Sequence, residues 1–563
     1  MARGLASALG RGARGDGHMG YYRDLREYLA TLEAHGKLRR IQRLINKDTE
    51  LHPLVRWQFR GLDEAQRTGW LFEQLTDLAG RRYEARVASA VMAPSREVYA
   101  LGLQCRPEEI WDRWQEAYRH PIEPRVVPDG PCQEVILRGA DLERSGGLYA
   151  FPIPMATNGW EALPRVTAGC WHTRDVDTGV INVGTYNAAP MGPLRTTCRL
   201  QHAAQMRWHI QKARQRGERL EAALVIGPVP AVAMTSTAKA PYGLSELALA
   251  GGLAREPIDV VRCQTVDLLV PATAEIVFEG YIDVDHVEPD PPSGEHTGYM
   301  IVGAEVFAFH ITCITHRRDP IWHDFISQMP PSESSCIRAV GVEGTMLSFL
   351  RKDCGIPQVK AVAQHDSGGA WRIMAIQFQD VGGVRTHNAI VWQALYAALS
   401  KSPDWPKIVI AVDDDIDPHD ADSLNWALAF RFQPHRDLRV VQGRSAILDQ
   451  SAMPHSFETS YTAHYPTSNT GPQGASAMLI DATRKWPYTP VSLPKREYME
   501  RARTIWEELG LPPLRPRAPW YGYNLGVWPA EFEELAALGA QGRFEEVAQR
   551  LISRARPVQR GEA

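Results

Sequence analysis

The sequence predicts a multidomain protein of the α/β class, α+β overall, and three observations support this prediction. The chain has 563 residues, which is too long for one hydrophobic core, so we expect two to four domains. Strand-like segments dominate residues 137–334, which indicates a sheet-rich domain. Helical and strand-like segments alternate in residues 335–495, as they do in an α/β domain.

Composition and charge favour a soluble, cytoplasmic protein that acts on small molecules. Hydrophobic residues make up 44% and charged residues 23% of the chain, and the net charge of -4 gives no basic surface for nucleic acid. No apolar stretch is long enough to span a bilayer, so we expect no membrane partner. The eight cysteines lack C-x-x-C spacing, which argues against a zinc site or a disulfide framework.

The N-terminal part predicts an α/β domain over residues 19–136. Residues 1–18 are basic and nearly free of acid, so we interpret them as a disordered leader, with an organelle-targeting segment as the alternative. Residues 22–36 predict an amphipathic helix that ends at a glycine. A second helix is expected at residues 108–117.

The middle part predicts a β-rich domain with one helical insertion. Its clearest strand pair consists of residues 275–278 and 306–315, and both faces of the latter are apolar, as in a buried sheet. A long helix is expected at residues 200–214. Shorter strand-like segments lie at residues 166–171, 179–186, 222–226, 231–234 and 266–269.

The C-terminal part predicts an α/β domain over residues 335–495, followed by a helical extension over residues 496–563. Helices are expected at residues 345–351 and 388–399. Residues 407–412 predict a buried strand.

Four segments carry residues suited to chemistry. Acidic residues 413–417 end a predicted strand and could hold a hard cation, or be solvated, or cap a helix. The Pro- and Gly-rich loop at residues 288–300 holds Asp290 and Glu295, which could divide acid and base work or form an exposed acidic turn. The other two segments are residues 182–187 and the combination of Gln201, His202 and residues 236–246; their Asn, His and Glu could bind Mg²⁺ or Mn²⁺, although a lone His is more often packed or solvated.

Taken together, these segments resemble the UbiD family of decarboxylases. The motifs are residues 24–29, Pro-Ala-Thr-Ala-Glu-Ile-Val-Phe-Glu-Gly at 271–280, Gly-Glu-His-Thr-Gly-Tyr at 294–299, residues 412–417 and Ile-Asp-Ala-Thr at 480–483. The resemblance covers residues 22 to about 489. It implies an N-terminal α/β domain, a central split β-barrel that binds flavin and a C-terminal α/β domain, assembled as a homodimer or homohexamer.

The resemblance also implies prenylated FMN, supplied by a flavin prenyltransferase, with Mn²⁺ or Mg²⁺ on its phosphate and K⁺ nearby. The implied metal ligands are Asn182, His202 and Glu246. The implied cofactor contacts are Asn182, Thr185, Tyr186, Gln201, His202, Ser236, Thr237 and Glu246.

The family's catalytic Glu-Arg-Glu pattern is only partly present. The resemblance implies that Glu295 is the proton donor, while Asp290 and Asn187 stand where the family has Glu and Arg. Ala477 stands where the family has a phosphate-binding Lys, and Lys239 could substitute. Because an opposite charge lowers a carboxyl pKa, loss of the Arg predicts that Glu295 holds its proton more readily.

The implied function is reversible, non-oxidative decarboxylation of an aromatic or α,β-unsaturated acid, or of its CoA ester as in phthaloyl-CoA decarboxylase. Loss of the Arg and Lys leaves an alternative, a non-catalytic subunit of a UbiD-type carboxylase complex. An ordinary flavin oxidoreductase is a weaker alternative, because the sequence carries no nicotinamide-binding motif.

Overall fold

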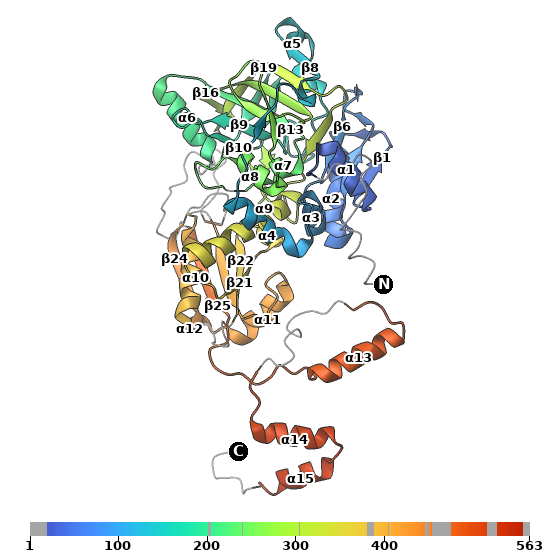
Figure 1. The fold of residues 1–563 in the computed structure, drawn as a ribbon, viewed down its shortest axis with the longest axis vertical. Coiled ribbons are helices and arrows are strands. Elements are labelled where there is room, and N and C mark those ends of the chain that lie inside the picture. The colour runs from blue at the N-terminus through green and yellow to red at the C-terminus, as the bar shows by residue number, and fades with distance from the viewer. Residues whose placement is uncertain are drawn as a thin grey trace.

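The computed structural model describes residues 20–200, 204–238, 240–302, 305–379, 388–402, 405–444, 449, 451–452, 475–514 and 526–555. Figure 1 shows a body of sheets and covering helices, from which the last helices stand away. The expected α/β architecture is therefore confirmed. Among the described helices, none is both long and apolar enough to cross a membrane.

The N-terminal part packs helices against a four-stranded sheet. Helix α1 (Leu25–Ala34) begins at Asp24, whose carboxylate accepts the N–H of Glu27, and it buries one face that includes Tyr28 and Leu32. This confirms the first predicted helix. The sheet has the order β1 (Leu38–Ile41), β3 (Gly69–Phe72), β6 (Arg86–Ser89) and β20 (Ile321–Asp324). Since β20 comes from much later in the chain, this sheet joins the N-terminal and middle parts.

Helix α2 (Leu51–Gly61) and two further helices complete this part. Helix α3 (Arg96–Gly102) begins at Ser95. Helix α4 (Ile110–Arg119) confirms the second predicted helix and buries Trp114.

The middle part is built on a largely antiparallel sheet of eight strands. Its order is β10 (Ile181–Thr185), β9 (Cys170–Arg174), β13 (Leu220–Ile226), β16 (Ile276–Pro289), β19 (Glu305–His316), β12 (Arg195–Cys198) and β11 (Pro190–Gly192), with β8 (Val135–Arg138) also paired to β19. The predicted pair is confirmed, because β16 and β19 are antiparallel neighbours with Phe278 opposite Ile314. Their apolar faces bury Trp171, Phe278 and Phe309.

Helices in the middle part differ from the sequence prediction in two places. The expected strand at residues 231–234 is wrong, since these residues lie in helix α7 (Pro230–Thr235). All six residues of α7 are buried, so the segment shows no periodicity, while Pro230 suits the first turn of a helix. The expected long helix is α6 (Gln205–Arg216), which starts later than predicted. Helix α8 (Glu246–Ala254) follows and is fully buried.

The C-terminal part has a five-stranded sheet in the order β21 (Val359–Gln364), β22 (Ile373–Phe378), β23 (Ile408–Val412), β25 (Ala475–Asp481) and β24 (Leu438–Arg444). Strand β23 and helix α10 (Asn388–Ser400) confirm the prediction. Helix α9 (Glu333–Ser348) connects this sheet to the middle part and is largely buried.

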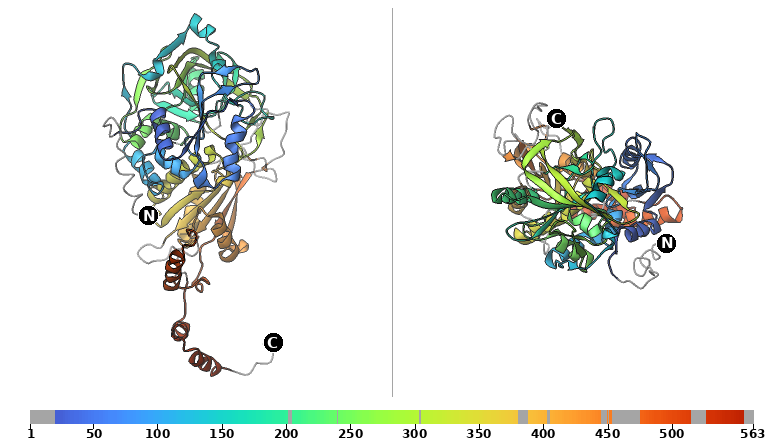
Figure 2. Two further views of the ribbon diagram at one scale, coloured as in Figure 1. Left: turned by 90° about the vertical axis from the view of Figure 1, so that its right-hand side faces the viewer. Right: turned by 90° about the horizontal axis from the view of Figure 1, so that it is seen from above.

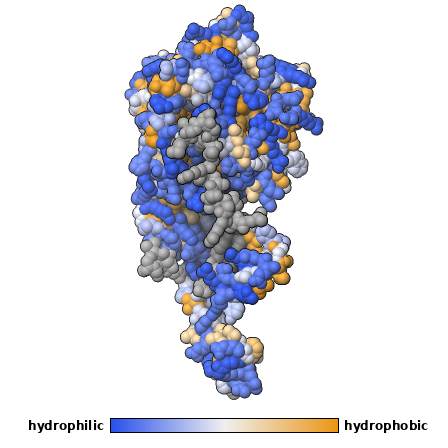
Figure 3. Space-filling view, turned by 45° about the vertical axis from the view of Figure 1, so that its right-hand side comes forward, coloured by the Kyte–Doolittle hydropathy of each residue, from blue (hydrophilic) through white to orange (hydrophobic). Residues whose placement is uncertain are grey.

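The end of the chain forms the predicted helices, α13 (Arg496–Glu508), α14 (Ala530–Ala540) and α15 (Phe544–Ile552). Figure 2 shows them beyond the five-stranded sheet, and they bury almost no side chains. The face in Figure 3 is mostly hydrophilic, with small scattered apolar patches.

Candidate active site

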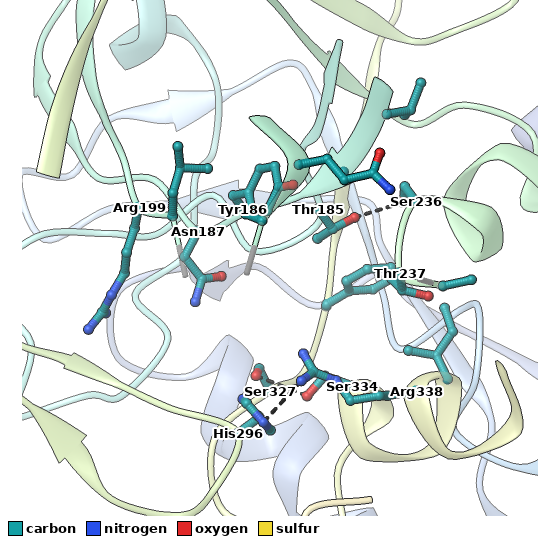
Figure 4. A pocket seen from close by; sticks show the side chains of 18 of the residues that line it. Thr185, Tyr186, Asn187, Arg199, Ser236, Thr237, His296, Ser327, Ser334 and Arg338 are labelled. Atoms are coloured by element: carbon teal, nitrogen blue, oxygen red, sulfur yellow. Dashed lines mark hydrogen bonds between the residues drawn. The ribbon is translucent and has the colours of Figure 1, made fainter. Parts of the chain in front are cut away.

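A cavity of about 390 Å³ lies where the middle sheet, helix α9 and the C-terminal part meet. Segments far apart in the sequence line it, as Figure 4 shows for part of its wall. Polar residues include Asn182, Thr185, Tyr186, Asn187, Arg199, Ser236, Thr237, Glu246, Glu295, His296 and Arg338. Apolar walls include Ile337, Trp371 and Trp405, the last two from the C-terminal part. The fold thus brings most of the sequence-predicted site residues into one cavity.

Asn182 and Glu246 bring a buried amide and a buried carboxylate to one end of the cavity. Asn182 lies on β10, and Glu246 is the first residue of α8. Burial raises the pKa of Glu246 to about 7, although its carboxylate accepts the N–H of Val183 at 2.7 Å. The buried side-chain nitrogen of Asn182 makes no hydrogen bond of ordinary geometry to the described residues. An amide and a carboxylate in this state suit a hard divalent cation.

The predicted third ligand, His202, and the predicted cofactor contact Gln201 lie outside the described residues, as does Lys239. Within the described ranges, no group of three or more His, Cys, Asp or Glu could hold a metal ion. The predicted ligand set contains an Asn and the undescribed His202, so Glu246 is its only member among the groups counted. The finding therefore does not test the predicted set. Ala477 is buried in β25 and packs in the C-terminal core.

Hydroxyl groups line the neighbouring wall. Thr185 ends β10 and Ser236 follows α7; the two hydroxyls lie 2.7 Å apart, and the N–H of Thr185 donates to the carbonyl of Ser236 at 3.0 Å. Thr237 follows directly and also lines the cavity (Figure 4). Tyr186 adds an aromatic ring to this wall. These groups could contact the polar part of a cofactor.

Glu295 lies on a tight hairpin between β17 (Ser293–Gly294) and β18 (Met300–Ile301). Its N–H donates to the carbonyl of Tyr299 at 3.0 Å, and Gly298 closes the turn with a φ of 103°, which favours glycine. The predicted alternative, an exposed acidic turn, is wrong for Glu295 and Asp290, which are both buried.

A chain of hydrogen bonds runs from Glu295 through His296 to Arg338. Nδ1 of His296 bonds to the carboxylate of Glu295, and Nη1 of Arg338 lies 3.1 Å from Nε2 of His296. An arginine can only donate, so Nε2 accepts and the proton of a neutral His296 sits on Nδ1. The His296 ring stacks on Trp371 with centroids 4.9 Å apart. His296 therefore holds Glu295 in place against the C-terminal part.

The charges near Glu295 overturn one expectation from the sequence. Burial alone would raise the pKa of Glu295, but His296 and Arg199 together hold the pKa below its usual value. Burial and the charge of Arg338 lower the pKa of His296 to about 4, so His296 is neutral near pH 7 and donates to an ionised Glu295. The expectation that Glu295 holds its proton more readily is wrong, because His296 and, after it, Arg199 favour the ionised carboxylate although position 187 is the neutral Asn187.

Asp290 pairs with two arginines and is not part of the cavity wall. Its carboxylate lies 3.0 Å from Nη1 of Arg165 and 3.4 Å from Nη1 of Arg199, and the pair with Arg165 is almost completely buried. Arg199 also donates to the hydroxyl of Ser293. The Nη2 atom of Arg199 is buried without a partner among the described residues, and Arg199 lines the cavity. Asp290 thus positions Arg199.

Three functional candidates were missed in the sequence: Arg199, His296 and Arg338. Arg199 follows β12 directly and precedes the Gln-His pair, and His296 is adjacent to the predicted acid. Position in the sequence gave both a signal, but their orientation becomes visible only in the fold. Arg338 lies on α9 with no motif around it.

The acidic segment after β23 is not part of this cavity. Asp413 and Asp415 pair with Arg431 at 3.2 and 2.5 Å, and Asp413 also pairs with Arg484 at 3.2 Å. Arginines thus pair with Asp413 and Asp415, and His419 lies 3.7 Å from Asp417, so the cation proposed for this segment has no support in the described residues.

Comparison with known proteins places this fold and site in a family. A family model described as the 3-octaprenyl-4-hydroxybenzoate carboxy-lyase Rift-related domain matches residues 125–330, and one described as the C-terminal domain of the same carboxy-lyase matches residues 336–482. An uncharacterized protein of Archaeoglobus fulgidus is 29% identical over 490 residues, which cover 83% of this chain and 92% of that protein.

Solved structures of UbiD-class enzymes share the fold of this chain. The UbiD-class enzyme HmfF from Pelotomaculum thermopropionicum in complex with FMN is 30% identical with a TM-score of 0.70, over 85% of this chain and 99% of that chain. An evolved dimeric form of HmfF in complex with prFMN is 28% identical with a TM-score of 0.71, over 86% and 100% of the two chains. Vanillic acid decarboxylase from Sedimentibacter hydroxybenzoicus in closed form, 23% identical with a TM-score of 0.70 over 87% and 99%, shares the fold. The chain belongs to the UbiD family of carboxy-lyases.

Proposed function

We propose that this enzyme catalyses reversible, non-oxidative decarboxylation of an aromatic or α,β-unsaturated acid with prenylated FMN. The observation that carries the proposal is the position of Glu295, a buried carboxylate on the wall of the cavity that also holds Asn182 and Glu246. The similar enzyme HmfF has been solved in complex with prFMN and with FMN.

The cofactor end of the cavity is formed by Asn182, Glu246, Thr185 and Ser236. Asn182 and Glu246, together with His202, would hold Mn²⁺ or Mg²⁺ against the cofactor phosphate, with K⁺ nearby. Prenylated FMN bound there would supply the electron sink for the loss of CO₂.

The substrate end is formed by Asn187, Arg199, Glu295 and His296. Arg199 presents the buried, unpaired Nη2 atom, which can bind the departing carboxylate by a charge-assisted hydrogen bond. Glu295 receives the proton for the vacated carbon and delivers it, and His296 keeps the carboxyl group oriented. Asp290 holds Arg199 from behind, and Asn187 shapes the wall beside it.

The non-catalytic alternative rested on the neutral Asn187 and Ala477. The neutral Asn187 no longer supports that alternative, because Arg199 supplies a cation in the same cavity wall. The CoA-ester form of the substrate remains part of the proposal as one substrate class.

The test is to purify the protein after coexpression with a flavin prenyltransferase. We expect mass spectrometry of the released ligand to show prenylated FMN, and a panel of aromatic and α,β-unsaturated acids and CoA esters to include one that releases CO₂. Protein without any bound flavin under these conditions would contradict the proposal. The accessory-subunit alternative would be favoured if the protein binds flavin but neither decarboxylates any acid nor exchanges hydrogen at the vacated carbon in D₂O.

A further inference from the structure

Arg338 is a cation of the cavity wall that forms no ion pair with any of the residues that the structure describes. It projects from α9, donates to Nε2 of His296 at 3.1 Å, and its guanidinium carbon lies 5.3 Å from the centre of the Trp371 ring. No carboxylate in the described part of the chain lies within 4 Å of it. Of its five N–H donors, His296 takes one.

The other enclosed arginines in the described part of the chain have an oxygen acceptor: Arg56, Arg113 and Arg207 donate to backbone carbonyl groups, and three more pair with carboxylates. Arg165 is paired with Asp290, Arg431 with Asp415, and Arg96 with Glu343, at distances between 2.5 and 3.0 Å. An enclosed charge without a partner costs free energy, and burial accordingly lowers the pKa of Arg338 despite the nearby charge of Glu295. The cost is explained if a ligand supplies the anion.

The two other anions expected in this cavity already have partners. A cofactor phosphate belongs at the end formed by Asn182, Glu246 and Ser236. The departing carboxylate belongs beside Arg199, which comes from the segment after β12, whereas Arg338 comes from α9 (Figure 4). A third anion therefore has to come from elsewhere on the substrate.

The walls around Arg338 fit a flat ring. Trp371 lies beside it, and Ile337, Val342 and Trp405 line the cavity with it. Aromatic and aliphatic surfaces of this kind bind an aromatic ring, while a guanidinium forms paired hydrogen bonds with a carboxylate. Ring and carboxylate are thus recognised together.

We propose that Arg338 binds a second carboxylate of the substrate, so that the preferred substrates are aromatic dicarboxylates, of which one carboxylate departs and the other stays. This inference rests on the proposed decarboxylase function and narrows its substrate class. Arg338 acts as a specificity-determining residue, and Ile337, Val342 and Trp405 supply apolar walls for the ring.

The experiment measures binding to the flavin-loaded enzyme, so it does not depend on turnover. Dissociation constants are determined for benzoate, phthalate and isophthalate by titration calorimetry. We expect at least one dicarboxylate to bind about tenfold or more tightly than benzoate, as one charge-assisted pair allows. Arg338→Met should abolish that preference and leave benzoate binding within about threefold, and Arg338→Lys should retain part of it because the charge remains.

Arg372→Met is the matched control. Its guanidinium carbon also lies near the Trp371 ring, at 5.5 Å, but Arg372 does not line the cavity, so the preference should persist. Three outcomes would overturn the inference: equal binding of benzoate and both dicarboxylates, no binding of any of them, or an equal loss for both classes in Arg338→Met. Failure of the proposed function is seen separately, as absence of bound flavin or of CO₂ release.

Discussion

The backbone N–H of Arg199 donates a hydrogen bond of 3.2 Å to the carbonyl oxygen of Asn187, and both side chains line the same cavity. The two residues lie 12 positions apart in the sequence but on neighbouring segments, one after β12 and one after β10. Arg199 can therefore supply a positive charge close to position 187, where Asn187 is neutral.

This relationship predicts the result of moving the cation back. Arg199→Gln should lower kcat/KM by about 10- to 100-fold, the effect of losing one charge-assisted hydrogen bond. Adding Asn187→Arg to that variant should restore part of the loss, while Asn187→Arg alone should lower activity by crowding two cations. Steady-state kinetics of the three variants, each with flavin content checked, measure this. No recovery in the double variant would show that the two positions are not equivalent.

Asp290 should matter first for stability. Asp290→Asn leaves Arg165 buried without its charge partner, and breaking a buried pair costs about 3–5 kcal/mol. Chemical denaturation should show a decrease of that size in the free energy of unfolding. The matched control is Asp319→Asn, which removes the exposed partner of Arg86 and should cost less than about 1 kcal/mol. A variant as stable as the parent would refute the structural role.

The sequence predicted elements well where burial leaves a periodic trace. Helix α1 shows one buried face and was located by that periodicity, whereas β19 is apolar on both faces and was located as a long buried strand. Helix α7 is buried on every side, so its pattern could not distinguish helix from strand. Tertiary packing decided that case.

The site was predictable only as far as motifs extend. Asn182, Glu246 and Glu295 lie in matching segments, and the fold brings all three to one cavity. Arg338 lies 43 positions beyond Glu295 and acts through His296, a contact that depends on how α9 packs on the hairpin. The pKa of Glu295 was mispredicted for the same reason, because local sequence does not show which charges approach from other segments.

Metal and flavin should depend on the same carboxylate. Glu246→Gln keeps the shape of the side chain but removes a negative oxygen ligand, so both ligands should be lost together. Elemental analysis and flavin absorbance of the purified variant measure this, with thermal unfolding as the check that the chain is folded. Full occupancy of metal and flavin in a folded variant would rule out Glu246 as a ligand.

A second charged cluster links stability to alkaline pH. Arg96 of α3 pairs with Glu343 of α9 at 2.7 Å, and His419 of the C-terminal part lies 3.4 Å from the same carboxylate and 3.7 Å from Asp417. Burial opposes a charge on His419, but Glu343 and Asp417 raise its pKa to about 9. The cluster connects helix α3 of the N-terminal part with helix α9 and the C-terminal part.

Because the folded-state pKa of His419 is raised, its contribution is fully present below the unfolded pKa of about 6.5 and is lost as the pH rises through about 9. Since the side chain is partly exposed, we expect a contribution of about 1 kcal/mol or less. Melting temperatures between pH 6 and 10 should fall more for the parent than for His419→Gln. Parallel curves for the two proteins would contradict this assignment.

Glu295 should be required for turnover but not for cofactor binding. A positioned acid contributes about 100- to 10,000-fold to a rate, so Glu295→Gln should lose at least the lower figure. Flavin should remain bound, since Glu295 is not among the groups at the cofactor end. Glu295→Asp should retain some activity, because the shorter acid still carries a proton. His296→Asn tests the positioning role: it should lower kcat less and move the pH at which Glu295 titrates in the pH profile upward, since loss of the His296 hydrogen bond removes a contact that lowers the pKa of Glu295.

The decisive measurement follows deuterium exchange at the vacated carbon of the product in D₂O together with CO₂ release. Exchange requires a group that moves a proton to and from that carbon, and turnover requires the same proton before the product can leave, so Glu295→Gln should slow both to a similar degree. A Glu295→Gln variant with bound flavin that exchanges and decarboxylates at the parent rate would make Glu295 a residue of the turn, not the acid. If exchange slows but CO₂ release does not, protonation is separable from bond cleavage, and Glu295 acts only in the later step.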